Sequence, residues 1–199
     1  MSFIQMPPEQ ASDDLIAELF ADDQRSFGYV ANYTTLFAYR PEVYLAWEQL
    51  KEAIKANMDL RRYELATLAA ARRMGSAYCS LAHGKVLRDH FYDVATLRKI
   101  VTDRHHAGLD PVDVAVMDFA DRVTADAGSV TADDVAALRA HGLSDGEILD
   151  VALAAAVRCL FSKVIDAMGV EPDAVYRGEL EPELHEVLTG SGPLALQQR

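Results

Sequence analysis

The sequence predicts an all-α protein that folds as a bundle of helices. Apolar residues recur at helical spacings, and no stretch shows a convincing strand pattern. Thr131 and Ser144 are each followed three positions later by an acidic residue, which is the capping-box signature of a helix start. The chain of 199 residues contains no linker or internal repeat. We therefore expect one all-helical domain over residues 1–199, with a mobile tail from about residue 190.

Capping residues, prolines and glycines set the limits of the expected helices. Residues 1–11 carry two adjacent prolines and predict an extended lead-in. Pro41 and Pro111 suit the first position of a helix, and Gly75 suits the residue just past a helix end. The expected helices begin near residue 12 and then cover 31–38, 41–57, 59–75, 77–91, 93–102 and 181–188, with further helices starting at 110, 131 and 144.

Two helices carry apolar patterns that predict how they pack. Val43, Trp47, Leu50 and Ile54 form one stripe, which predicts that all four side chains face the core. The helix that begins after Ser144 is apolar on every face, as is typical of a helix in the middle of a bundle or at an interface. We therefore expect a homo-oligomer, most simply a two-fold dimer.

Composition excludes several classes of partner. The net charge of −12 disfavours binding to nucleic acid and to anionic membranes, because both require clustered Lys and Arg. The first residues lack the features of a secretory signal, and the longest apolar run, 148–165, is interrupted by charges and is too short for a membrane span. We expect a cytoplasmic protein. In that reducing compartment, a structural disulfide between Cys79 and Cys159 is not expected.

The residues with chemical potential concentrate between Glu64 and His83. Gly75 and Ser76 predict the break between two helices, with Ser76 as the N-cap of the second. Cys79 then occupies the third helical position. There the free backbone N–H groups and the positive end of the helix dipole favour a thiolate over a thiol. This position predicts a reactive cysteine.

Glu64, His83 and Cys79 have spacings that suit a proton relay. His83 follows Cys79 by one helical turn, so both side chains share a face and the imidazole can take the thiol proton. Distances along an antiparallel helix hairpin can be counted outward from Gly75 at about 1.5 Å per residue. On this count Glu64 stands at roughly 16 Å, His83 at roughly 12 Å and Cys79 at roughly 6 Å. We therefore expect Glu64 to orient and charge His83, and His83 to activate Cys79.

This pattern resembles the alkylhydroperoxidase D and carboxymuconolactone decarboxylase superfamily over roughly residues 25–170. Glu64, Cys79 and His83 match in type and spacing the Glu, the second Cys and the His of a pattern close to C-x-x-C-x-x-x-H. The late helix is similar to the last core helix of the peroxidase-related branch. The resemblance implies an all-helical alkylhydroperoxidase D-like fold and assembly into dimers, trimers or hexamers. In the peroxidase branch it also implies a cycling C-x-x-C disulfide, whose first Cys is Ser76 here.

Each of the three residues also has a purely structural interpretation. Alone, Cys79 is consistent with a small buried hydrophobe, and His83 with a core histidine whose hydrogen bonds are satisfied. Glu64 is equally consistent with a surface ion pair to Arg61 or Arg72. The shared geometry of the three residues favours a site over these alternatives.

The residues near Cys79 and the second cysteine likewise have both a functional and a structural interpretation. Tyr78 and Ser76 are candidate substrate-binding residues, with packing and helix capping as their alternatives. Cys159 is expected in the core, and a resolving-thiol role is its minority interpretation. Three mixed ligands without a second Cys or His nearby are a weak metal signature, so no metal is expected. The remaining histidines lack ligand spacing and stay unassigned: His90, His105, His106, His141 and His185.

The residues and the resemblance together predict a thiol-dependent peroxidase that reduces an alkyl hydroperoxide in antioxidant defence. Cys79 would be its nucleophile, His83 its proton acceptor and Glu64 the group that orients His83. The expected partners are a small hydroperoxide and an external thiol reductant, with no cofactor. Two alternatives stay open, namely a carboxymuconolactone decarboxylase-like enzyme acting on a small organic acid or lactone, and a non-catalytic helical association protein.

Overall fold

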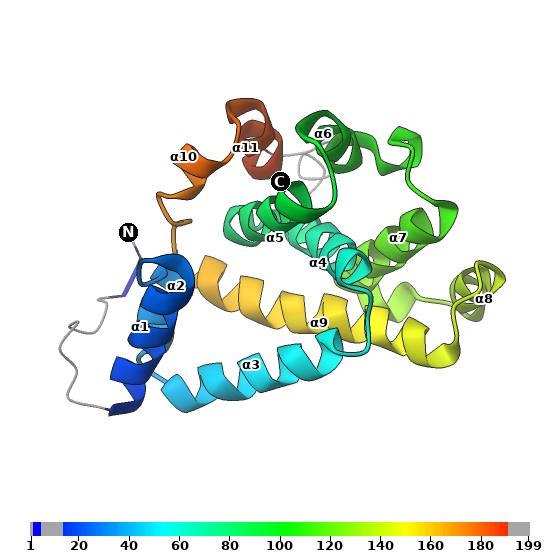
Figure 1. The fold of residues 1–199 in the computed structure, drawn as a ribbon. Coiled ribbons are helices and arrows are strands. Elements are labelled where there is room, and N and C mark those ends of the chain that lie inside the picture. Colours follow the sequence, from blue (N-terminus) through cyan, green and yellow to red (C-terminus); the bar gives the residue numbers. More distant parts are fainter. Residues whose placement is uncertain (1, 5–13, 191–199) are drawn as a thin grey trace.

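The computed structural model describes residues 2–4 and 14–190, and these contain helices and no strand. The predicted all-α fold is therefore confirmed. Most of the expected lead-in and the tail from residue 191 lie outside the described residues, and the single-domain assignment stays a prediction. The helices labelled in Figure 1 are α1 (Asp14–Phe27), α2 (Asn32–Phe37), α3 (Pro41–Lys55), α4 (Leu60–Met74), α5 (Ala77–His90), α6 (Val94–Asp103), α7 (Pro111–Asp126), α8 (Ala132–Ala140), α9 (Asp145–Ala167), α10 (Tyr176–Glu179) and α11 (Pro182–Thr189).

Helix α4 is the centre of the bundle. Its residues from Tyr63 to Ala71 are all buried, and four of these nine are alanines. Small side chains let neighbouring backbones approach closely, and α4 contacts α5, α7 and α9. Figure 1 shows α4 enclosed by these three helices, with α3 lying along α9. Any polar side chain on the buried part of α4 therefore needs a partner inside the bundle.

The α4–α5 hairpin forms where the sequence predicts it. Gly75 has φ 72°, a left-handed conformation that glycine adopts without strain. Ser76 then precedes α5, which places Cys79 at the third position of that helix. The Ser76 side chain makes no capping hydrogen bond, and its hydroxyl instead donates to Asp166 Oδ1 on α9 at 3.1 Å. The predicted N-cap position of Ser76 is therefore confirmed, but its side chain does not cap α5 and instead ties the hairpin to α9.

Both predicted capping boxes are confirmed. The backbone N–H of Asp134 donates to Thr131 Oγ1 at the start of α8, and that of Glu147 donates to Ser144 Oγ at the start of α9. The helix predicted at 181–188 is present as α11, whereas the short α10 before it was not expected. No helix in the described ranges combines the length and the apolar character needed to cross a membrane.

Two side chains of the predicted α3 stripe face solvent. Trp47 and Ile54 are buried, but Val43 and Leu50 are 54% and 49% exposed, so the prediction that all four face the core is wrong. Tyr44 takes the core position next to Val43 and stacks on Trp47, with ring centroids 6.0 Å apart. The larger aromatic ring gains more from burial than valine does, which turns α3 about its axis.

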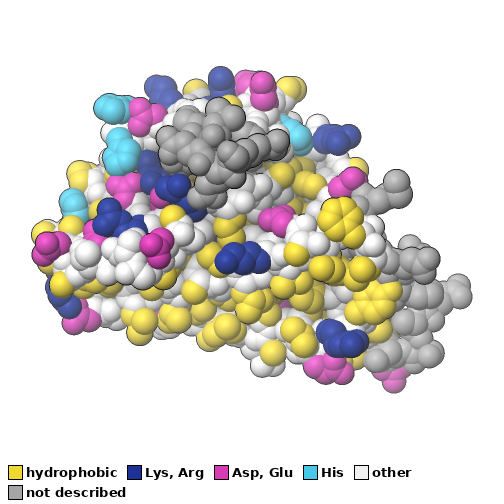
Figure 2. Space-filling view, turned by 180° about the vertical axis from the view of Figure 1, so that it is seen from behind, with side chains coloured by type: hydrophobic (Ala, Val, Ile, Leu, Met, Phe, Trp, Pro, Cys, Tyr) yellow, Lys and Arg dark blue, Asp and Glu magenta, His cyan; other side chains and the backbone are white. Residues whose placement is uncertain are grey.

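Helix α9 also has an exposed apolar face, although its opposite face is buried against α4, α7 and α3. Figure 2 shows hydrophobic side chains gathered across the lower half of the molecule, on the face opposite to that in Figure 1. Contiguous exposed apolar surface of this kind is typical of an association site. We use the term apolar band for the exposed residues of α3 and α9, which are Val43, Leu50, Leu149, Leu153, Leu160 and Val164.

We propose that the apolar band joins two copies of the chain, and we expect light scattering to give a dimer mass at micromolar concentration. Replacing Leu153 and Leu160 by Glu should give a monomer, because the contact would then bury unpaired carboxylates. The control is Leu60→Glu, since Leu60 is also exposed but lies outside the band at the start of α4. It should leave the mass unchanged, and a monomeric wild-type chain would refute the proposal.

Candidate active site

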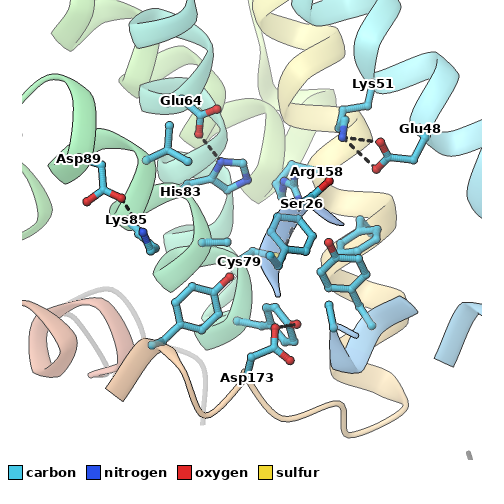
Figure 3. A pocket seen from close by; sticks show the side chains of 18 of the residues that line it. Ser26, Glu48, Lys51, Glu64, Cys79, His83, Lys85, Asp89, Arg158 and Asp173 are labelled. Atoms are coloured by element: carbon cyan, nitrogen blue, oxygen red, sulfur yellow. Dashed lines mark hydrogen bonds and ion pairs between the residues drawn. The ribbon is translucent and has the colours of Figure 1, made fainter. Parts of the chain in front are cut away.

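A cavity of about 550 Å³ lies beside the α4–α5 hairpin. Its lining comes from α3, α4, α5 and α9, together with the segments 26–33 and 173–179, as Figure 3 shows in part. Four of the five expected site residues line it, namely Glu64, Tyr78, Cys79 and His83. Ser76 is not among the lining residues and points to Asp166, so the structure does not place it where a substrate in this cavity would be bound.

Glu64 and His83 are joined inside the bundle. His83 Nδ1 lies 2.6 Å from Glu64 Oε2 and 3.1 Å from Thr67 Oγ1. The Thr67 hydroxyl donates to the carbonyl of Tyr63 at 2.8 Å, so its oxygen can only accept from the ring. This network assigns the imidazole proton to Nδ1. The other nitrogen, Nε2, is buried and has no hydrogen-bond partner among the described residues, and it lies on the side of the ring away from Glu64 (Figure 3).

The electrostatics of this pair favour a neutral imidazole beside an ionised carboxylate. Burial lowers the pKa of His83, and the charge of Arg158 acts in the same direction, against the opposing effect of Glu64. Burial alone would raise the pKa of Glu64, but His83, with smaller effects from Lys55 and Arg158, holds it below its usual value. His83 Nε2 is therefore a free base at neutral pH.

The hydrogen-bond partner of the Cys79 thiol is Arg158 of α9. Arg158 Nη1 donates to Cys79 Sγ at 3.6 Å, and both residues are buried, at 5% and 1% exposed. No hydrogen bond joins Cys79 to His83 within the described part of the chain, although both lie on α5. The sequence predicted a direct transfer from thiol to imidazole, and the structure does not contain the contact that such a transfer requires.

Arg158 is a buried cation without an ion-paired carboxylate in the described residues. Its guanidinium lies over the rings of Trp47 and Phe161, at 5.7 and 5.4 Å from their centroids. Burial alone would lower the pKa of Arg158, but neighbouring groups, with Cys79 the strongest, hold it above its usual value. The sulfur of Cys79 is therefore placed to serve as its counter-charge.

Sequence reasoning missed Arg158 as a site residue. It treated the arginine as a charge that interrupts an apolar run, and 79 positions separate it from Cys79. A usable signal was present, because an arginine within the buried stretch of a long helix requires a partner inside the fold. That signal does not tell which residue the partner is.

Tyr78 lines the cavity through a second buried cluster. Its hydroxyl donates to Asp173, which also accepts from the Asn32 backbone N–H at 2.9 Å and from the Tyr29 hydroxyl at 3.4 Å. Burial and the contact with Asp173 raise the pKa of Tyr78 well above its usual value, so the phenol stays neutral. Asp173 thus joins α5 to the segments that enclose the cavity, from before α2 and from after α9.

Cys159 faces α7 rather than the cavity. Its Sγ donates to Thr124 Oγ1 at 3.7 Å, and it is not a lining residue. Both cysteines are free. The described residues contain no group of three or more His, Cys, Asp or Glu side chains placed to hold a metal ion.

Known structures share this arrangement of helices. No protein-family model and no curated protein matches the sequence. The alkylhydroperoxidase AhpD core of an uncharacterized peroxidase-related protein from Ralstonia eutropha JMP134 superposes with a TM-score of 0.80 at 25% identity, covering 88% of this chain and 94% of that one. An uncharacterized peroxidase-related protein from Silicibacter sp. TM1040 gives 0.81 at 23% identity, covering 89% and 94%. The debrominase Bmp8, in complex with 2,3,4-tribromopyrrole, gives 0.75 at 14% identity, covering 92% and 100%.

These similarities cover almost the whole of each related structure, so the chain shares its all-helical architecture with one class of proteins. Within that class the chain has the alkylhydroperoxidase D-like fold, and the resemblance found in the sequence is confirmed at the level of fold. The debrominase shows that this fold also serves other reactions. Activity therefore has to be argued from the residues in the cavity.

The buried neutral His83 predicts that the protein loses stability in mild acid. Because burial lowers its pKa below the ordinary value of 6.5, the folded state binds fewer protons than the unfolded state, and stability falls as pH drops through 6.5. For a chain of this size, each 1 kcal/mol of stability lost lowers the unfolding temperature by about 2–4 °C. Thermal unfolding at pH 7.5 and 5.5 should show this loss, and His83→Asn should reduce it.

The pKa of Glu64 is lowered from its ordinary value of 4.5, so the stability that Glu64 contributes is lost only below pH 4.5. This lies outside the range from pH 7.5 to pH 5.5. His141→Asn is the matched control, because His141 is exposed at the end of α8. It should keep the wild-type difference between the two pH values. If His83→Asn keeps it as well, His83 is not the group responsible.

The contact between Arg158 and Cys79 predicts how fast the thiol reacts. Arg158→Met should slow alkylation of Cys79 by iodoacetamide at pH 7 by about tenfold or more, because it removes the cation that favours the thiolate. The rate is measured in a Cys159→Ser background, so that one thiol is followed. Arg88→Met, which removes an arginine on α5 that does not line the cavity, should leave the rate unchanged. An unaltered rate in a folded Arg158→Met variant would count against thiolate activation.

Proposed function

We propose that the protein is a thiol-dependent peroxidase in which Cys79 is the nucleophile. The observation that carries this proposal is the contact between the Cys79 sulfur and the buried Arg158 guanidinium, which has no ion-paired carboxylate among the described residues. A cation held in a desolvated site favours the thiolate, which is the reactive form. The position of Cys79 in the first turn of α5 acts in the same direction.

In the proposed reaction the Cys79 thiolate attacks the distal oxygen of a hydroperoxide. The O–O bond breaks, and the sulfur keeps the distal oxygen with its proton as a sulfenic acid. The proximal oxygen leaves as an alkoxide and takes up a proton to become the alcohol. The sulfur is oxidised by two electrons and the hydroperoxide is reduced by two.

His83 supplies the proton that the leaving oxygen needs. Nε2 is a free base, so it can hold the proton released by the thiol and then donate it to the alkoxide. Because no hydrogen bond joins Cys79 Sγ to Nε2, this proton passes through a group bound between them, such as water or the substrate. Glu64 fixes the ring through Nδ1 and stabilises the imidazolium while it exists.

Return of the enzyme to its thiol state requires an external thiol. Ser76 occupies the place of a partner cysteine, and the other cysteine of the chain, Cys159, faces Thr124. A reductant thiol would condense with the Cys79 sulfenic acid, releasing water and leaving a mixed disulfide, and a second thiol would then free Cys79. We therefore propose a one-cysteine cycle.

Thiol-dependent removal of a halogen from an aromatic ring is the second candidate. It is favoured by the aromatic side chains in the cavity, among them Trp47, Tyr78 and Phe161, and by the fold shared with a debrominase. The carboxymuconolactone decarboxylase-like and non-catalytic alternatives rank lower, because neither gives a role to the contact between Arg158 and Cys79. Bromide release from 2,3,4-tribromopyrrole, without peroxide consumption, would favour the debrominase-like reaction.

Intact-mass analysis after a pulse of tert-butyl hydroperoxide, and separately of cumene hydroperoxide, tests the proposed function. The wild-type chain should gain one oxygen atom, on Cys79, and should consume the peroxide in the presence of a dithiol. Cys79→Ser should do neither, whereas Cys159→Ser should behave like the wild type, because Cys159 does not line the cavity. A chain that takes up no oxygen under these conditions is not a peroxidase.

The same assay applied to Ser76→Cys tests the missing partner thiol. An N-cap side chain reaches the third residue of its helix, so the new cysteine should form a disulfide with Cys79 after peroxide. Turnover with a dithiol should then rise severalfold, since a neighbouring thiol attacks a sulfenic acid faster than a free one. Without that disulfide and that increase, Cys79 is not forming a sulfenic acid that a neighbouring thiol can trap.

A further inference from the structure

Five aromatic rings from α2, α3, α5, α9 and α10 contact one another in a row, which we call the aromatic wall. Trp47 stacks on Phe161 with ring centroids 4.2 Å apart, and Tyr33 meets Phe161 edge-on at 5.3 Å. The same Tyr33 ring contacts Tyr78 at 5.6 Å, and Tyr78 contacts Tyr176 at 6.1 Å. All five rings line the cavity, and Figure 3 shows aromatic side chains among those that line it. Such a wall offers offset and edge-to-face contacts to a further ring.

The groups next to this wall, which we call the floor, are polar and incompletely hydrogen-bonded, and one of them, Arg158, lies over the Trp47 and Phe161 rings. His83 Nε2, the Tyr63 hydroxyl and Arg158 Nε are buried, and none has a hydrogen-bond partner among the described residues. Their side chains line the cavity with Cys79. Buried polar groups are normally satisfied, so three unsatisfied ones among the residues that line one cavity point to a ligand with oxygen atoms.

The size of the cavity excludes a good fit for a very small substrate. Its volume of about 550 Å³ lies within the range of sites that enclose a ligand of many atoms. A water molecule occupies about 30 Å³ in the liquid, so hydrogen peroxide or a short alkyl hydroperoxide would leave most of this space unfilled. Contacts with the aromatic wall would then contribute nothing to recognition.

We infer that the substrate is an aromatic hydroperoxide, held with its ring along the aromatic wall and its peroxy group on the floor. This inference rests on the proposed peroxidase function and names its substrate class. In this orientation the Cys79 thiolate takes the distal oxygen as the O–O bond breaks. The proximal oxygen stays with the aromatic molecule and receives the proton held on His83 Nε2, giving an aromatic alcohol and a sulfenic acid.

Cumene hydroperoxide and tert-butyl hydroperoxide form a matched pair for the kinetic test. Both are tertiary hydroperoxides, and they differ by a phenyl group in place of a methyl group. We expect kcat/KM for cumene hydroperoxide to be about 100-fold higher, because the phenyl group buries several additional carbon atoms against the wall. Equal kcat/KM values for the two substrates would overturn the inference.

Binding of the product alcohols tests the inference without turnover. Trp47 is the single tryptophan of the chain and lines the cavity, so its emission reports occupancy. In Cys79→Ser, 2-phenyl-2-propanol should produce a saturable change, 2-cyclohexyl-2-propanol should bind about threefold more weakly, and tert-butanol should give no saturable change. If no peroxidase activity is found, this measurement still decides whether the cavity selects an aromatic molecule. Equal affinity for the phenyl and cyclohexyl alcohols would mean that it does not.

A pair of phenylalanines provides the control for the wall. Phe161 and Phe119 are both buried, at 4% and 7% exposed, but Phe119 does not line the cavity. Phe161→Leu should reduce the preference for cumene hydroperoxide by about fivefold or more, and Phe119→Leu should leave it unchanged. An equal reduction in both variants would indicate a general effect of core packing and would contradict the assignment of the wall.

Discussion

The burial of one guanidinium constrains the whole site. Arg158 lies on the inner face of α9, over two aromatic rings, and no carboxylate in the described residues pairs with it. An unpaired charge in such a place costs several kcal/mol. The Cys79 sulfur accepts a hydrogen bond from this guanidinium at 3.6 Å. In the proposed function the same contact would serve both the burial of Arg158 on α9 and the reaction at Cys79 on α5.

The hairpin holds the other half of the site rigidly. Glu64 lies on the fully buried stretch of α4, and the tight turn at Gly75 brings His83 of α5 back to it. On the far side of α5, a Cβ at Gly84 would meet Leu188 of α11 at 2.5 Å, so glycine allows the two helices to touch next to His83. Glu64 and Thr67 fix the imidazole through Nδ1, and a base that is positioned in advance needs little reorganisation during a reaction.

Local chemistry explains what the sequence could predict. Gly75 and the two capping boxes act within a few residues, so they determine where α5, α8 and α9 begin. The contact between Glu64 and His83 spans one hairpin and follows from helix geometry. Arg158 is brought to Cys79 by the packing of distant helices, which no local pattern records.

The difference between local patterns and long-range packing also explains why the exposed surface and the segments that enclose the cavity could not be predicted. A helical stripe predicts that a face is apolar, but it does not tell whether the bundle or another surface covers it, as Val43 and Leu50 show. Asp173 lies in a stretch without a strong pattern and gains its role from tyrosines far away in the chain. Sequence spacing could therefore bring Glu64, Cys79 and His83 together, but it could not identify the other residues that enclose the cavity.

The hydrogen bonds of Asp173 have a consequence for the order in which the protein assembles. Glu64 and His83 are 19 residues apart, whereas Asp173 accepts from residues that are 95, 141 and 144 positions away. Contacts of short range in the chain close small loops and can form early, while long-range contacts carry a larger loop-closure entropy and form late. The α4–α5 hairpin can thus be native before the cavity is enclosed. Any local opening of the enclosing segments, with the core still folded, would have to break the three hydrogen bonds of the Asp173 carboxylate, so access to Cys79 would be set by this one side chain.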